Sequence, residues 1–224
     1  PASYLVTASP GGATCTVYAP ATSCSISPLT NGTSYTFSAT ATNSTGTSAA
    51  ATSAAVTPAG KPDAPTGVNA VSGNGSATVS FVAPIVTGGP AIASYTVTAS
   101  PNGATCTVNA PATSCVVPGL TNGTAYTFAV TANNGLFTSS ASTASSSVVP
   151  STVPDAPTAV TAASTTSGSA TITFTAPVNN GGSAVTSYIV TSSPAGATCA
   201  IGTNATTYVC TGLTDGTSYT YSVV

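Results

Sequence analysis

The sequence predicts an all-β protein made of small β-sandwiches in tandem. Two landmark segments recur along its 224 residues. The segment Tyr-x-Val-Thr-x-Ser-Pro-x-Gly-Ala-Thr-Cys begins at Tyr4, Tyr95 and Tyr188. The segment Leu-Thr-(Asn/Asp)-Gly-Thr-x-Tyr begins at Leu29, Leu120 and Leu213. Both recur at intervals of 91 and then 93 residues. Units of this length can each hold a core, so we expect an array of domains rather than a solenoid of short repeats.

The middle copy begins with strands of alternating pattern. Residues 77–82 alternate polar and apolar side chains, which is typical of a strand buried on one face. A Thr-Gly-Gly-Pro turn at 87–90 separates this strand from the next, which is predicted over 92–99. A Pro-Asn-Gly turn then leads to a short strand over 104–108. A second short strand follows, so Cys106 and Cys115 are expected on neighbouring strands.

The second half of the middle copy has the same character. The turn at 121–124 leads into a long strand with Tyr126, Phe128 and Val130 on one face. A last strand, weaker in sequence, is expected near 140–149. No stretch shows the 3.6-residue apolar period of a helix. About seven short strands in about ninety residues favour a sandwich of two sheets.

The repeats set the expected domain boundaries. Residues 1–58 are predicted to be the C-terminal part of a first sandwich, 62–150 a complete one, and 154–224 the N-terminal part of a third. We interpret the 224 residues as a window on a longer repetitive chain; the alternative is that a neighbouring subunit supplies the missing strands. Proline-rich linkers join the copies end to end and predict semi-rigid spacing, hence a rod.

These motifs together resemble a fibronectin type III domain. The resemblance is carried by the Pro-Asp-Ala-Pro entry at 62–65, the 77–84 strand, the Gly88-Gly89 turn, the Tyr95-x-Val97 strand and the Leu-x-x-Gly-x-x-Tyr corner. It implies that leucine and tyrosine anchor the corner between the sheets, with the tyrosine hydroxyl bonded back to the backbone. The corner pairs are Leu29 and Tyr35, Leu120 and Tyr126, and Leu213 and Tyr219.

The chain also departs from the family pattern. Phe81 and Phe174 stand where the family usually has tryptophan, which predicts fewer aromatic contacts in the core. The chain contains no Arg-Gly-Asp, so integrin binding does not carry over from the family. The paired cysteines make it most similar to the secreted bacterial versions of this domain.

Cysteines occur two per repeat. The pairs are Cys15 with Cys24, Cys106 with Cys115, and Cys199 with Cys210, at separations of 9, 9 and 11. Zinc sites need closely spaced cysteines or histidine partners, which are absent, and free thiols do not explain the pairing. We therefore predict three disulfides, each worth about 2.5–3 kcal/mol of unfolding free energy in the chain-entropy model. Such bonds form in oxidising compartments, so the chain is expected outside a cell or at its surface.

Composition argues against catalysis and against several kinds of partner. The chain has one Lys or Arg, three Asp or Glu and no His. The charged residues are Lys61, Asp63, Asp155 and Asp215, all in turns or linkers. Acid–base pairs and triads therefore cannot assemble, so we predict that the chain is not an enzyme, with no catalytic residue, cofactor or metal. One cation cannot neutralise a nucleic acid, and no apolar run is long enough to span a bilayer.

Two functions fit these features. The first is a structural component of an extracellular or cell-surface fibre, filament or sheath, because weakly charged surfaces repel one another little and favour self-association. The alternative is a stalk or spacer in an adhesin or a secreted carbohydrate-active protein. The partners expected are other copies of the chain, with cell-surface or polysaccharide contact as a further prediction.

Overall fold

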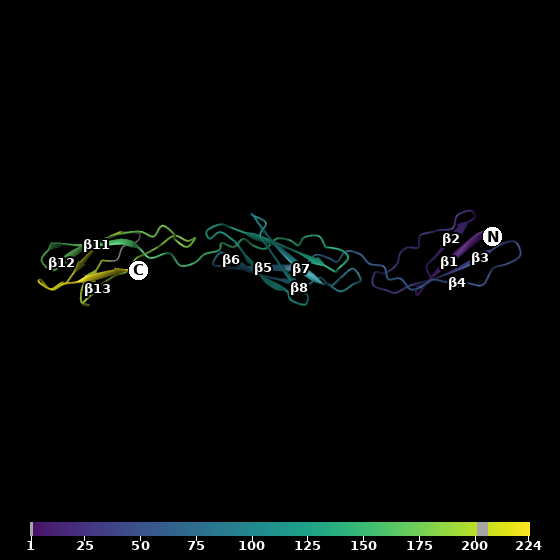
Figure 1. Cartoon of the computed structure of the whole chain (residues 1–224), viewed down its shortest axis with the longest axis horizontal. Coiled ribbons are helices and arrows are strands. Elements are labelled where there is room, and N and C mark those ends of the chain that lie inside the picture. Colours follow the sequence, from purple (N-terminus) through teal and green to yellow (C-terminus); the bar gives the residue numbers. More distant parts are fainter. Residues whose placement is uncertain (1, 201–205) are drawn as a thin grey trace.

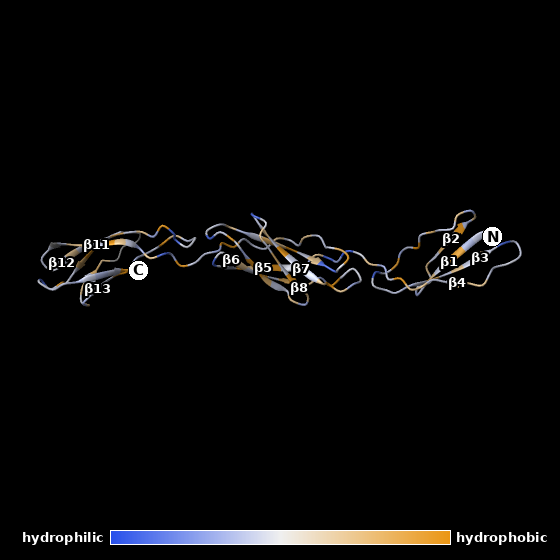
Figure 2. Cartoon of the chain, in the orientation of Figure 1, coloured by the Kyte–Doolittle hydropathy of each residue, from blue (hydrophilic) through white to orange (hydrophobic). Residues whose placement is uncertain are grey.

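A computed structural model describes residues 2–200 and 206–224. Figure 1 shows three β-structured bodies in a row, which we call module 1 (residues 2–58), module 2 (62–150) and module 3 (154–224). Every regular element in the described residues is a strand, and the sheets are antiparallel. Hydrophobic positions, orange in Figure 2, occur in all three modules. The chain is therefore an all-β array of tandem modules, as predicted.

Module 2 is a sandwich of two three-stranded sheets. One sheet has the order β10-β7-β8 and the other β5-β6-β9. The strands of the first sheet are β7 (Ser94–Ser100), β8 (Thr105–Asn109) and β10 (Thr127–Asn133). The strands of the second are β5 (Thr66–Gly73), β6 (Ser76–Val82) and β9 (Ser114–Pro118). The alternating residues of 77–82 thus belong to a central strand, whose inward side chains are buried and whose outward ones are exposed.

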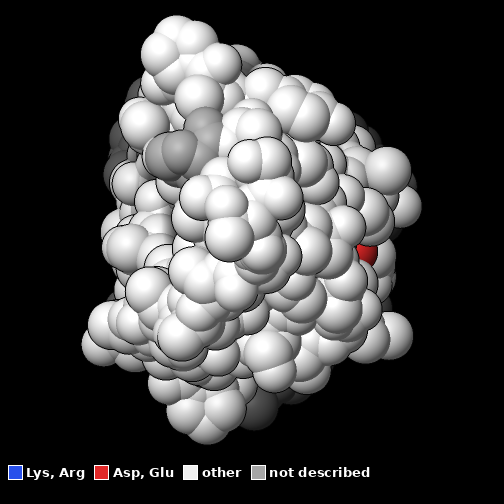
Figure 3. Space-filling view, turned by 90° about the vertical axis from the view of Figure 1, so that its right-hand side faces the viewer, with Lys and Arg blue, Asp and Glu red and all other residues white. Residues whose placement is uncertain are grey.

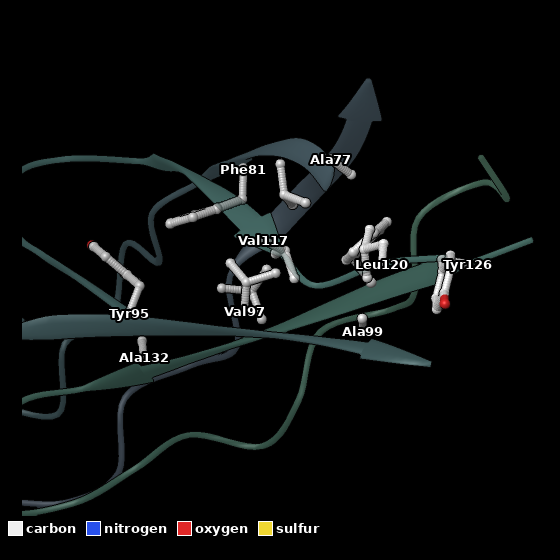
Figure 4. Packing of buried hydrophobic residues seen from close by; sticks show 12 residues of the cluster. Ala77, Phe81, Tyr95, Val97, Ala99, Val117, Leu120, Tyr126 and Ala132 are labelled. Carbon is white, nitrogen blue, oxygen red and sulfur yellow. The ribbon is translucent and has the colours of Figure 1, made fainter. Parts of the chain in front are cut away.

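The core of module 2 lies between these sheets, as Figure 4 shows. Val79, Val97 and Phe128 are completely buried. Val79 lies on β6 and Val97 on β7, the middle strands of the two sheets, and Phe128 lies on β10. The rings of Phe81 and Tyr95 lie 4.9 Å apart at their centroids and are tilted by 58°. Phe81 therefore makes its aromatic contact across the two sheets.

Module 1 forms one sheet. Its strand order is β2-β1-β3-β4. The strands are β1 (Ser3–Ser9), β2 (Thr14–Tyr18), β3 (Thr36–Thr42) and β4 (Ala51–Thr52). Among its described residues no second sheet covers this one, and only Ala8 and Tyr35 are buried hydrophobic residues. The apolar side of the sheet opens into a groove of 510 Å³ lined by Tyr4, Val6 and Phe37.

Module 3 has a larger and a smaller sheet. The larger has the order β11-β12-β15-β14, and the smaller pairs β13 with β16. The strands are β11 (Thr158–Thr166), β12 (Ser169–Thr175), β13 (Val190–Ser193), β14 (Thr198–Cys199), β15 (Thr207–Thr211) and β16 (Thr220–Val223). The short strand that carries the first cysteine therefore changes sheets. It pairs with β7 in module 2 as β8, but with β15 in module 3 as β14.

The expected strand near 140–149 is wrong in detail. Residues 138–148 form isolated bridges, Thr138 with Asn133 and Val148 with Tyr126, and no regular strand. Between these bridges Ser139, Ser142 and Ser145 accept hydrogen bonds through their hydroxyls from the backbone N–H groups of β10. Serine hydroxyls replace backbone carbonyls as the acceptors, so the segment follows a three-residue period.

Candidate functional site

Charged groups do not gather anywhere on the described surface. Lys61 and Asp63 lie in the first linker, Asp155 in the second, and Asp215 at the corner of module 3. The described residues contain no group of three His, Cys, Asp or Glu that could hold a metal ion. Figure 3 shows one end of the molecule almost entirely without charge. The described residues also contain no helix that could cross a bilayer.

The carboxylate of Asp215 has a defined structural role. Its oxygens accept hydrogen bonds from the hydroxyl of Ser167 and from the backbone N–H of Gly168 at 3.0 Å. These bonds, the hydroxyl first, hold the pKa of Asp215 below its ordinary value, because they favour the ionised form. In module 2 the same position is Asn122, which accepts from the N–H of Gly75 at 2.8 Å. The carboxylate thus fastens a corner to the β11–β12 hairpin.

One disulfide links the cysteines of each module. The bonds join Cys15 to Cys24, Cys106 to Cys115 and Cys199 to Cys210, and no described cysteine is free. In module 2 the bond connects β8 with β9, which belong to opposite sheets. In module 3 it joins directly paired residues of one sheet, with 3.9 Å between their Cα atoms. The same sequence feature therefore clamps two sheets in one module and one sheet edge in another.

The three corner tyrosines make the same contact. The hydroxyl of Tyr35 accepts from the backbone N–H of Thr30 at 3.0 Å, Tyr126 from Thr121 at 3.1 Å, and Tyr219 from Thr214 at 3.2 Å. The Thr30 N–H also holds the pKa of Tyr35 below its ordinary value. Of the corner leucines, Leu120 is buried, whereas Leu29 and Leu213 are half-buried. The corner geometry is thus repeated, whereas the burial of the corner leucine differs between the modules in the described residues.

Sequence reasoning missed the buried amide of Asn134. Its Nδ2 donates to the carbonyl of Gly60 at 3.0 Å and to that of Thr87 at 2.8 Å. Its Oδ1 accepts from the N–H groups of Leu136 and Phe137. All hydrogen-bonding positions of the amide are therefore used, and they fasten the linker to module 2. A signal was available, because Asn43 stands 91 residues earlier in the first copy.

The sequence model of the fibronectin type III domain matches residues 63–148 and 155–224. These two stretches span more than half of the chain. The chain belongs to the fibronectin type III domain family. Its tandem modules each carry a disulfide.

Several known proteins are similar to the chain. Chitinase A1 of Niallia circulans is 37% identical over 131 residues, which cover 54% of the chain and 18% of that enzyme. Among solved structures, domains A168–A170 of titin are 26% identical, with a TM-score of 0.40 over 51% of the chain and 40% of that structure. The FN1–FN3 domains of chicken CNTN1 are 17% identical, with a TM-score of 0.39 over 99% of the chain and 83% of that structure.

Proposed function

We propose that the chain is a non-catalytic spacer or stalk in a secreted carbohydrate-active protein. The similarity to a chitinase carries this proposal, since it lies in a chain made of fibronectin type III modules and covers 18% of that enzyme. The chitinase activity itself is a property of the relative. The comparison thus favours the alternative function predicted from the sequence over the fibre.

The residues of the chain support a role without chemistry. The four charged residues are dispersed over two linkers and one corner, and none of the pockets described among residues 2–200 and 206–224 is lined by two carboxylates. Hydrolysis of a glycosidic bond usually needs two carboxyl groups within about 5–10 Å of each other. The row of modules in Figure 1 instead offers length, roughly 90–120 Å for three units of sandwich size.

The disulfides support a location outside the cell. A bond in every module fits an oxidising environment, because cytosolic thiols are kept reduced. Self-association into a fibre or layer is retained as a prediction about this weakly charged surface. It is tested by sedimentation of the chain at increasing concentration.

The experiment that tests the spacer is an assay of the purified chain with insoluble chitin. We expect no release of soluble sugar, and small-angle scattering should give an extended particle with a maximum dimension near the length given above. Release of sugar would contradict the non-catalytic role. A compact particle would contradict the spacer. Detection of the native protein only inside cells would contradict secretion.

A further inference from the structure

The two junctions between modules are built from the same three segments. Each uses a corner turn of the preceding module, which is residues 30–33 in module 1 and 121–124 in module 2. Each uses the linker together with the module residues at its two ends, 58–63 or 150–155. Each also uses a double-glycine loop of the following module, which contains Gly88-Gly89 or Gly181-Gly182. The junctions therefore allow a residue-by-residue comparison.

Backbone hydrogen bonds tie the linker to both modules in the same pattern. At the first junction the N–H of Gly32 donates to Pro58 at 2.9 Å, and the N–H of Gly60 donates to Gly88 at 2.8 Å. A further bond joins the N–H of Asp63 to Val86. Since both ends of the linker are paired with a module, it is not a free tether.

The second junction repeats these bonds. The N–H of Gly123 donates to Pro150 at 2.9 Å, and the N–H of Thr152 donates to Gly181 at 2.8 Å. The N–H of Asp155 donates to Asn179 at 3.0 Å. Donors and acceptors thus occur at corresponding positions one repeat later, which a chance contact between neighbours would not produce twice.

Glycine is required at these contacts by space as well as by backbone conformation. A Cβ atom at Gly88 would overlap the carbonyl oxygen of Gly60, and one at Gly181 would overlap that of Thr152. A Cβ at Gly89 would lie 2.7 Å from the nitrogen of Gly32, and one at Gly32 would lie 2.9 Å from the Cα of Gly89. Real Cβ atoms do not approach backbone this closely, so the corner turn and the loop are in direct backbone contact.

We infer that the double-glycine loop is a docking surface for the corner turn of the preceding copy of the module, and that this contact fixes the orientation of successive modules. The partner is thus a further copy of the same module. Asn134 reinforces the first junction, because it holds the carbonyls of Gly60 and Thr87 together. The inference rests on the proposed spacer function only for its biological purpose. That purpose is a spacer that is stiff at the junctions between its modules.

Two glycines of the chain allow the effect of steric contact to be separated from the effect of backbone strain. Gly32 and Gly216 occupy the same position of the corner turn, in modules 1 and 3, and both have φ of +80°. A Cβ at Gly32 would meet Gly89, whereas at Gly216 nothing lies within 4 Å. Alanine therefore introduces the same backbone strain at both positions, but of these two substitutions only Gly32→Ala disturbs the junction between modules 1 and 2.

The test measures, by NMR, residual dipolar couplings of the whole chain with Gly32→Ala or Gly216→Ala. In the unmodified chain we expect modules 1 and 2 to share one alignment tensor. Gly32→Ala should abolish this shared tensor, while Gly216→Ala should preserve it. Separate tensors in the unmodified chain would overturn the inference, and so would a shared tensor that survives Gly32→Ala.

A second pair keeps the test decisive if Gly32→Ala unfolds module 1. Gly88→Ala changes the other side of the joint, and Gly103→Ala is its control, with φ of +69° and nothing within 4 Å. Amide shifts of β6 and β10 report whether module 2 remains folded. A stiff chain that releases sugar from chitin would refute the proposed function but not the docking of successive modules. A chain that releases no sugar but has freely moving modules would refute the docking but not the non-catalytic role.

Discussion

Modules 1 and 2 contain the same three-stranded sheet, β2-β1-β3 in module 1 and β8-β7-β10 in module 2, but bury it to different extents. Tyr95, Val97 and Phe128 are 3% exposed or less in module 2, where the β5-β6-β9 sheet covers them. Their counterparts Tyr4, Val6 and Phe37 are half-buried and line an open groove. Registers are nevertheless conserved, since β1 pairs with β3 as β7 pairs with β10.

This difference separates what a strand determines for itself from what its neighbours supply. Backbone pairing and the tyrosine corner form in both modules, because they need only residues of one sheet and one turn. A closed core needs the opposite sheet, whose central strand brings Ala77, Val79 and Phe81. Within these 224 residues, the two modules should therefore differ in stability mainly through the apolar area that they bury.

The largest effect is expected from removing the phenylalanine that modules 1 and 2 carry at the same position, Phe37 and Phe128. Phe128→Ala should lower the unfolding free energy of module 2 by about 3–5 kcal/mol, because a fully buried ring leaves a cavity. Phe37→Ala should cost module 1 less than half of that, since its ring is already half-exposed. Chemical denaturation followed by NMR, module by module, measures both. Equal losses would mean that Phe37 is buried in solution.

The next effect concerns the disulfides. Replacing Cys106 and Cys115 by serine should lower the unfolding free energy of module 2 by about 2.5–3 kcal/mol, while β9 stays paired with β6. Replacing Cys15 and Cys24 should in addition release residues 19–28, because no strand is formed there. Backbone amide relaxation measured by NMR distinguishes the two outcomes. Unchanged relaxation of residues 19–28 would show that another contact holds this segment.

A smaller effect is expected at the corner. Tyr126→Phe removes the hydroxyl that accepts from Thr121, and should lower the unfolding free energy of module 2 by about 0.5–1.5 kcal/mol. The same change at Tyr35 should affect module 1 less, since that corner anchors one sheet. Thermal unfolding of each variant gives the comparison. Tyr18→Phe is the control, because Tyr18 is 71% exposed, and it should leave stability unchanged.

The smallest effect extends the comparison to module 3 and depends on pH. Folding lowers the pKa of Asp215, so its contribution to stability is complete above the ordinary carboxyl pKa and is lost as pH falls through the lowered value. The amide signal of Gly168 should therefore shift in acid, whereas that of Gly75, bonded to Asn122, should not. Asp215→Asn should abolish the shift; its persistence would assign the titration to another group.

The sequence predicted the elements whose signals are local. Alternation over 77–82 gave the strand β6, and the recurring Leu-x-x-Gly-x-x-Tyr segment indicated a corner, because each depends on residues close in the chain. The change of sheet by β14 was not predicted, since pairing with β7 or β15 depends on long-range competition between two sheet edges. The contacts between the double-glycine loops and the corner turns were not predicted either, because two consecutive glycines are typical of a turn.

The segment 139–145 was also misjudged for a physical reason. Serine has no strong preference for strands, and its hydroxyl can replace a backbone acceptor. The spacing of Ser139, Ser142 and Ser145 by three residues was visible, but a strand has a period of two. The hydrogen bonds to β10 give this spacing its meaning only once both segments are placed.

This serine segment has a consequence for crowded surroundings. An ordinary outer strand offers a regular row of groups to which a foreign chain can attach and seed aggregates. Here the outer segment contacts β10 with a three-residue period, whereas an incoming strand has a period of two, so we expect the segment to disfavour extension of the β10 sheet on that side. In a chain with so few charged residues, this mismatch of period takes the place of charge repulsion in disfavouring pairing with another chain.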